Sequence, residues 1–350
     1  MSVQQRGEYE VRVYDAVSKV DPAQWNAVVE RSPLGSVFQR HGWLSAIEGA
    51  GVEGVRHVVV TKSGAPLGVL PAVVDALPGS FRRLGTPRPG YGGLLVLSDE
   101  EQVTEALLDG VERACEDTDA VGHQFTALDP GTTRYERALA ERGYRSTVSG
   151  CRPVVDLRQG WEAVLDGMSR SRRRAVRTGL DRSFEVTERA PTREALDEFY
   201  AGYRRVIDRV GGTAQPRSFF RGLTAVADRV FLPFLTVDGD HAGALLCLLD
   251  EEQSTVHYLF SAVEREHFDV NASELLHAHA MRRGIENGFD DYDFGETRAD
   301  FRDGLFGFKA GFGGRVVPTL TWERGCDPVR WPAFRVGRAL YRRFSDGSEG

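Results

Sequence analysis

The chain has 350 residues, a net charge of −7, 41% hydrophobic residues and 27% charged residues. This length suits two domains of about 150 residues each, and the negative charge argues against a general nucleic-acid coat or a membrane-surface protein. The apolar runs, such as GALLCLL, are shorter than the ~20 residues of a membrane helix. Because the N-terminus also lacks the apolar region of a signal peptide, we expect a cytoplasmic protein without a transmembrane segment.

Four cysteines lie far apart in the sequence, at Cys115, Cys151, Cys247 and Cys326. No CxxC pair is present, and no spacing of cysteine and histidine suits zinc. The pattern predicts reduced thiols in a cytosolic protein. We expect neither a metal site nor a bound cofactor.

The first half of the chain alternates predicted strands and helices. A strand at 9–15 precedes a helix at 21–32, in which Asp21 is the cap and Pro22 lies in the first turn. The elements predicted after it are a helix within 32–51, two strands within 55–76, a Gly/Pro-rich loop and a strand within 81–97, a helix at 98–117 capped by Ser98, a strand at 123–130 and a helix at 135–144.

The second half repeats this order with little sequence identity. Its predicted strands lie at 153–157, at 183–190, in a three-stranded meander at 229–263, at 290–296 and at 315–322. Its predicted helices lie at 161–182, 191–211, 217–227, 273–288 (capped by Ser273) and 327–344. The repetition predicts a duplicated α/β domain, each half a mixed sheet flanked by helices. We place one domain at 8–150 plus a C-terminal helix at 326–345, and the other at 151–325.

The segment GLFGFKAGFGG at 304–314 keeps a lysine in a chain that otherwise favours arginine. Lys309 is one of three lysines among 44 basic residues, the others being Lys19 and Lys62. A composition that replaces lysine by arginine wherever either serves indicates that a lysine is needed here. The alternative is that Lys309 extends from a turn while the neighbouring phenylalanines pack.

Four motifs occur in one order along the chain: SPLGSVFQRHGW, SRSRRRAVRTGLDRSFEV, GIENGFDDYDFGE and GLFGFKAGFGG. With them the chain resembles the FemAB/FemX family over nearly its whole length. Members of that family consist of two tandem GNAT-like domains and transfer an amino acid from aminoacyl-tRNA to an amine. The resemblance implies an α/β fold of two tandem GNAT-like (acyl-CoA N-acyltransferase-like) domains and an aminoacyltransferase that forms a peptide or amide bond.

In that family the Phe-Lys pair of the last motif lies where the tRNA 3′ end is expected. The resemblance therefore assigns Phe308 and Lys309 to the donor site, with Lys309 as a catalytic candidate. The chemistry agrees, because glycines let a backbone approach a ribose or phosphate closely. An aromatic ring stacks on an unpaired base with roughly 1–3 kcal/mol, and a lysine is a compact charge for a phosphate or an oxyanion.

Family members that act on nucleotide-linked cell-wall precursors hold the diphosphate with a lysine, an Arg-Pro pair and tyrosines. The matching positions here are Ser45, Gln215, Phe219 and Phe260. Because the charged clamp is missing, we expect a smaller or uncharged acceptor, an amine or peptide of specialised metabolism such as antibiotic biosynthesis. It is expected between the domains, near Phe219, Tyr258, Phe260 and Asp129. A peptidoglycan cross-bridge enzyme remains an alternative.

An arginine cluster precedes the second strand of the second half. Arg170, Arg173, Arg174 and Arg177 follow the i, i+3, i+4, i+7 spacing, so they share one helix face. This face can bind tRNA phosphates without reading sequence. The alternative is a solvated face paired with nearby acidic residues.

A CoA-dependent N-acyltransferase is the competing enzyme class. Its pyrophosphate loop is rich in glycine and leads into a helix N-terminus. The corresponding segment, EREHFDVNASELL, contains no glycine, and the glycines of TPRPGYGGLLV precede a strand. A third possibility is a degenerate, non-enzymatic binding module, against which the retained Lys309 speaks.

Asp129 and Asp293 are the main candidates for a catalytic base, because both lie at strand ends, where α/β folds tend to place chemistry. His257 and Glu264, which flank the predicted YLF strand, are further candidates. A structural hydrogen-bonding role is the alternative for each.

His277 and His279 are two apart on one predicted helix and are interpreted as packing or surface residues. The basic C-terminal helix is expected to pack on the first domain, membrane contact being the alternative. The transferred amino acid, the acceptor and the oligomeric state stay open.

Overall fold

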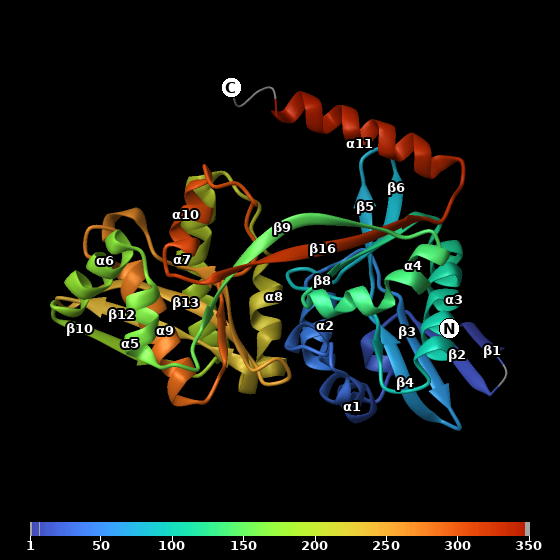
Figure 1. Cartoon of the computed structure of the whole chain (residues 1–350), viewed down its shortest axis with the longest axis horizontal. Helices are drawn as coiled ribbons and strands as arrows, with labels where there is room; N and C mark the ends of the chain where they lie inside the picture. Colours follow the sequence, from blue (N-terminus) through green and yellow to red (C-terminus); the bar gives the residue numbers. More distant parts are fainter. Residues whose placement is uncertain (1, 7, 347–350) are drawn as a thin grey trace. The chain divides into compact units, whose positions relative to one another are not determined.

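The computed structural model describes residues 2–6 and 8–346, with side chains for 8–338. It divides into two compact units, the described parts of Met1–Thr147 with Leu320–Gly350, and Val148–Thr319. The chain passes from the first unit to the second within strand β9 (Arg145–Asp156) and returns within β16 (Arg315–Gly325) (Figure 1). Each unit has its own hydrophobic core.

The first unit contains two groups of paired strands. One is antiparallel, in the order β1 (Ser2–Arg6), β2 (Tyr9–Tyr14), β3 (His57–Lys62), β4 (Ala65–Leu70) and β7 (Leu95–Val96). The other runs in the order β16, β8 (Ala120–Ala127), β6 (Phe81–Gly85) and β5 (Val73–Leu77), and its β6–β8 pair is parallel.

The helices of the first unit cover these strands with apolar faces. The α-helices are α1 (Pro22–Arg31), α2 (His41–Glu48), α3 (Glu100–Thr118), α4 (Glu136–Glu141) and α11 (Arg330–Asp346). The short 3-10 turns are η1 (Val17–Lys19), η2 (Val37–Gln39) and η3 (Pro130–Tyr135). Helix α3 packs on β2, β3 and β8, and Val103, Leu107 and Val111, four residues apart, point into the core.

The second unit is built on one sheet of adjacent strands. Their order is β10 (Phe184–Glu188), β12 (Pro233–Val237), β13 (Asp240–Asp250), β14 (Thr255–Ser261), β15 (Asp291–Asp293) and β9, with β11 (Val230–Phe231) paired to β13. The β14–β15 pair is parallel, and its neighbours β13–β14 and β15–β9 are antiparallel.

Helices lie against this sheet. They are α5 (Trp161–Gly167), α6 (Arg170–Leu180), α7 (Arg193–Val210), α8 (Arg217–Gly222), α9 (Ala272–Glu286) and α10 (Gly304–Ala310), with the 3-10 turns η4 (Leu223–Arg229) and η5 (Arg265–His267). Helix α9 packs on β12, β13 and β14, and α7 packs on β13 and β14 (Figure 1).

Several predicted boundaries are wrong. The helix predicted at 161–182 is broken at Met168 and Ser169, because Ser169 is extended and caps the new helix by accepting a hydrogen bond from the Arg172 amide. Ser98 and Ser273 are not caps, since Asp99 and Asn271 precede α3 and α9, each with left-handed backbone. The segment around Lys309, predicted only as glycine-rich, is the helix α10.

The prediction of four reduced cysteines is also wrong. Cys115, near the end of α3, and Cys326, just after β16, form a disulfide that links positions 211 residues apart. Spacing along the sequence could not reveal this pair, because only the return of the chain through β16 brings the two side chains together. Cys151 and Cys247 are free and buried.

The start of α11 packs on the first unit. The Phe334 ring is buried and meets Phe81 of β6 at 5.8 Å between ring centroids. Arg338 binds Glu323 of β16 through two hydrogen bonds of 2.9 and 3.0 Å. Among the described residues, no helix combines the length and apolar character needed to cross a bilayer.

Candidate functional site

Helix α10 presents Lys309. It begins after Asp303, whose carboxylate accepts a hydrogen bond of 2.8 Å from the Phe306 amide. Phe308 and Phe312 are four residues apart and turn toward the core of the second unit. Lys309 lies between them in sequence, so the packing of the two rings carries the lysine into the protein.

The Lys309 side chain is 6% exposed. Its Nζ donates hydrogen bonds to the backbone carbonyls of Gly295 at 3.3 Å and Glu296 at 3.1 Å, and lies 5.9 Å from the centre of the Tyr258 ring. Burial lowers the pKa of Lys309 from its ordinary 10.5 to about 8, although nearby Asp293 opposes the shift. A lysine that holds a proton only loosely near neutral pH can donate a hydrogen bond and can exchange that proton.

The glycines of this segment have a structural role that the sequence did not reveal. Gly313 has a φ of +89°, and an added Cβ would lie 2.2 Å from the carbonyl oxygen of Gly167. Gly304 and Gly307, in contrast, face open space. Gly313 thus brings the chain close to its own backbone, whereas the prediction had the glycines approach a ribose or phosphate.

The Phe308 ring is half-buried against His277, Phe312 and Arg172. His277 is buried, shares a hydrogen bond of 2.8 Å with the Tyr292 hydroxyl, and has its pKa lowered by burial to about 3. It is a packing residue, as predicted. His279, on the same helix, lies 3.1 Å from Glu188.

Arg172 is a residue that the sequence reasoning did not select. Its guanidinium lies over the rings of Phe308 and Phe312 and forms an ion pair with Glu274 of α9. The helical spacing contained a signal: Arg172 lies opposite the chosen arginines, on the face that also carries buried Val176.

The chosen arginines lie on α6, and Arg170, Arg174 and Arg177 are exposed. Arg173 instead binds the Asp166 carboxylate at 3.1 Å. A surface hollow of about 740 Å³ is lined by Arg170, Ser171, Arg174, Ala175, Thr178 and Asn271. Two of the chosen arginines, Arg170 and Arg174, thus line the same hollow as Asn271, the residue that precedes α9.

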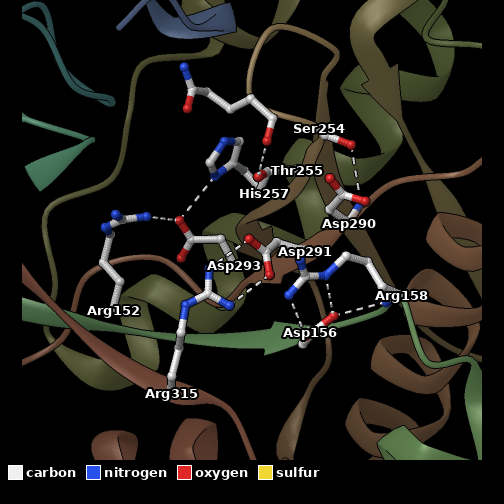
Figure 2. A network of polar contacts seen from close by, with 11 residues as sticks. Arg152, Asp156, Arg158, Ser254, Thr255, His257, Asp290, Asp291, Asp293 and Arg315 are labelled. Carbon is white, nitrogen blue, oxygen red and sulfur yellow. Dashed lines mark hydrogen bonds and ion pairs between the residues drawn. The ribbon is translucent and has the colours of Figure 1, made fainter. Parts of the chain in front are cut away.

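Asp293 lies at the end of β15 and is 0% exposed. It forms an ion pair with Arg152 and lies 3.1 Å from His257 Nδ1 (Figure 2). It also accepts a hydrogen bond of 2.8 Å from the Gly295 amide. Burial disfavours its charge, but Arg152 and His257 outweigh burial and hold the pKa of Asp293 well below its usual range. A carboxylate so enclosed has no direct access to a substrate amine, so its geometry does not support the predicted role as base.

Asp129 belongs to the first unit, at the end of β8. Its half-buried carboxylate accepts a hydrogen bond of 2.6 Å from the Gly131 amide and caps η3. Ser45, also in the first unit, is exposed on α2. Their assignment to catalysis and acceptor binding stays a prediction.

The acceptor residues predicted in the second unit belong to an aromatic cluster. Phe260 contacts Tyr203, Phe219 and Phe220 at ring-centroid distances of 5.1, 6.3 and 5.4 Å. Phe219 is wholly buried, Phe260 is half-buried, and the Gln215 backbone N–H donates a 3.0 Å hydrogen bond to the Tyr203 hydroxyl. Tyr258 is separate from this cluster and packs on His277 at 4.8 Å. Binding by these residues stays a prediction.

Within the described residues, no group of three or more His, Cys, Asp or Glu side chains has a geometry that would hold a metal ion.

Residues 166–303 match the family described as the acetyltransferase (GNAT) domain. No curated protein matches the sequence. The fold is similar to the crystal structure of FemX, with a TM-score of 0.73 at 16% identity over 93% of this chain and 99% of that one. The chain has a tandem GNAT fold.

Two further structures share this fold. L-PGS from Bacillus licheniformis has a TM-score of 0.58 at 14% identity, covering 91% of this chain and 96% of that one. A tandem GNAT protein from the clavulanic acid biosynthesis pathway has a TM-score of 0.54 at 14% identity, covering 91% and 99%. The predicted fold class, two tandem GNAT-like domains with mixed sheets, is confirmed.

Proposed function

We propose that this protein is an aminoacyltransferase that moves an amino acid from aminoacyl-tRNA to an amine acceptor. The observation that carries the proposal is the buried ammonium of Lys309, held on two backbone carbonyls beside an aromatic ring. The similarity to FemX over nearly both full chains supports the same reading. We take the acceptor to be a small amine or peptide, and a peptidoglycan precursor to be the alternative acceptor.

The reaction needs little chemistry from the protein. The acceptor nitrogen attacks the ester carbonyl, an amide C–N bond forms, the ester C–O bond breaks, and the proton lost by the amine ends on the ribose oxygen. Because the ester is already activated, the main tasks are to place the amine near it and to stabilise the oxyanion.

Lys309 suits the second task. Among the described residues its Nζ donates to two carbonyls, so one of its three N–H bonds remains for a ligand. An ammonium in a poorly hydrated place stabilises a developing oxyanion more strongly than it would in water. The adjacent Phe308 ring offers a face for the terminal base of the tRNA.

The α6 arginines suit the tRNA body. Three of them are exposed, and two line the hollow in front of α9. Contacts of this kind bind phosphates without regard to sequence, and their strength falls steeply with salt.

CoA-dependent N-acyl transfer is the second candidate, because residues 166–303 match an acetyltransferase domain. In its favour, α9 begins soon after the central strand β14, where a helix N-terminus can bind phosphate. Against it, the segment before α9 has no glycine and is folded as the 3-10 turn η5.

A donor-binding experiment separates the two candidates. Binding of aminoacyl-tRNA, deacylated tRNA and acetyl-CoA would be measured at 50, ~100 and ~200 mM salt, the range over which phosphate contacts lose most affinity. The proposal expects salt-dependent tRNA binding that weakens in the triple variant Arg170→Ala, Arg174→Ala, Arg177→Ala. The matched control replaces Arg193, Arg204 and Arg209 of α7. Tight acetyl-CoA binding without tRNA binding would overturn the proposal.

Transfer itself tests the role of Lys309. With a mixture of radiolabelled aminoacyl-tRNAs and candidate amines, Lys309→Met is expected to lower the rate by about 10²-fold or more, the usual effect of losing an oxyanion donor. Lys309→Arg is expected to be little faster than Lys309→Met, because the planar guanidinium does not fit a site shaped for a compact charge. Full activity of Lys309→Met would refute the role.

A further inference from the structure

Four buried charged groups form a row across the sheet of the second unit. They are Asp250 of β13, His257 of β14, Asp293 of β15 and Arg152 of β9, one from each of four adjacent strands. His257 Nε2 lies 3.2 Å from Asp250. His257 Nδ1 lies 3.1 Å from Asp293, and Arg152 pairs with Asp293 (Figure 2). Each of the four is at most 5% exposed.

The row alternates in sign when His257 is protonated. Burial disfavours the imidazolium, but the hydrogen bonds to Asp250 and Asp293 outweigh it and raise the pKa of His257 above its ordinary value. A buried charge is tolerated only when it is paired and hydrogen-bonded. The two carboxylates therefore need His257 between them, and the register pairs His257 directly with Asp293 in the parallel β14–β15 ladder.

The row is connected to the turn that holds Lys309. Asp293 accepts a hydrogen bond from the amide of Gly295, whose φ of +70° is suited to glycine. On either side of this turn, Phe294 and Thr297 bond to the backbone of β9, at Pro153 and Cys151. The turn is thus fixed at both ends by backbone and in its middle by the Asp293 carboxylate.

The carbonyls of this same turn, at Gly295 and Glu296, accept the hydrogen bonds of the Lys309 ammonium. We propose that His257 is a positioning residue for Lys309: clamped between Asp250 and Asp293, it keeps the turn at 295 and 296 in the shape that binds the lysine. His257 acts on the turn through Asp293, whose carboxylate contacts His257 Nδ1 and also accepts the hydrogen bond of the Gly295 amide. A catalytic effect of His257 rests on the proposed function. The structural coupling between His257 and Lys309 does not rest on it.

The small number of lysines permits a direct test without substrate. Protein labelled with [13Cε]-lysine carries three labelled side chains, Lys19, Lys62 and Lys309, and a Lys309→Arg sample identifies the third signal. The groups around Lys309 that influence its titration are Asp293, Cys151, Glu296, Asp303, His277 and Tyr258. The titration midpoint of Lys309 is then followed by NMR between pH 6 and 10.5.

His257→Gln removes the cation but keeps hydrogen-bonding atoms. Loss of the positive charge and release of the turn toward water both raise the Lys309 midpoint, by about one pH unit or more toward the ordinary lysine value. His279→Gln is the matched control, since His279 pairs with Glu188 outside the row. The Lys19 and Lys62 signals are internal references that should be the same in all samples.

Asp250→Asn provides a second variant with a smaller change. It leaves Asp293 intact but removes one of the two carboxylates that raise the pKa of His257, so His257 loses its proton more readily. Because His257, and not Asp250, contacts Asp293, the loss of the His257 charge outweighs the loss of the Asp250 charge, and the Lys309 midpoint should move in the same direction by less. If His257→Gln does not fold, the Lys309 midpoint in Asp250→Asn tests the inference by itself. A folded His257→Gln or Asp250→Asn protein with the wild-type Lys309 midpoint would overturn the inference. Full transfer activity of Lys309→Met would instead refute the proposed role of Lys309 in transfer, and tight acetyl-CoA binding without tRNA binding would refute the proposed function; both results leave the coupling intact.

Discussion

The guanidinium carbon of Arg172 lies 4.2 Å from the centre of the Phe308 ring. Arg172 comes from α6 and Phe308 from α10, and the same guanidinium pairs with Glu274 of α9. One side chain thus joins three helices beside Lys309. This contact fixes the ring that the proposed function assigns to the tRNA 3′ end.

Replacing Arg172 by lysine should destabilise the protein. The charge is retained, but a lysine cannot cover two rings and pair with Glu274 at once. We expect a loss of about 1–2 kcal/mol in the free energy of unfolding, the size of a desolvated cation–π contact. Urea denaturation measures it, with Arg174→Lys, exposed on the same helix, as control. Equal stabilities of the two variants would contradict the prediction.

The lowered pKa of Lys309 predicts a pH-dependent stability. Its pKa is about 8 in the folded protein and 10.5 as an ordinary lysine, so between these values the unfolded chain binds more protons. The free energy of unfolding of the wild type, relative to Lys309→Met, should therefore rise with pH over this interval, by about 3 kcal/mol in all. Denaturant titrations at pH 7, 8, 9 and 10 measure the difference, and a constant difference would contradict the lowered pKa.

Replacement by alanine should change the stability of the protein in opposite directions at Gly307, within α10, and at Gly313, just after this helix. Gly313→Ala places a Cβ 2.2 Å from the Gly167 carbonyl oxygen at a φ of +89°, so we expect destabilisation by at least about 1–3 kcal/mol. Gly307 faces open space within the helix, and Gly307→Ala should stabilise by about 0.5–1 kcal/mol. Thermal unfolding compares the pair. A Gly313→Ala protein as stable as wild type would show that the close approach is absent.

The disulfide predicts a thiol count. Unfolded, unreduced protein should show two reactive thiols, from Cys151 and Cys247, and reduced unfolded protein should show four. Native protein should react slowly, because both free cysteines are buried and burial raises the pKa of Cys247 to about 12. Four thiols without reductant would mean that the bond is absent. Cys115→Ala with Cys326→Ala should cost about 2–5 kcal/mol of stability.

Much of the fold could be predicted from local pattern. The alternation of apolar and polar residues in β2 and the 3.6-residue period of apolar residues in α3 each place apolar side chains on one face. Each pattern identifies its element without information about the segments that pack on it. Boundaries were less accurate where two local preferences compete. At Met168 and Ser169, for example, helix-forming residues lie on both sides of a serine that prefers to cap.

The site was predicted in part. The bias against lysine singled out Lys309, and the motif order singled out Phe308. Arg172 was not assigned to the site, and His257 was considered only as a base, because their roles depend on which strands and helices become neighbours. Asp293 was selected for its position at a strand end, but its neighbours Arg152 and His257 come from sequence positions 141 and 36 residues away.

The sequence by itself determined the alternation of strands and helices, the duplication, and the retention of a lysine in α10, because each is written in the spacing of residues along the chain. Only the tertiary structure decided the disulfide, the burial of Lys309 and the row from Asp250 to Arg152. Pairing of Cys115 with Cys326, and of His257 with two carboxylates, arises when distant segments meet. The pKa of a buried group then follows from the solvent it has lost and the charges it has gained.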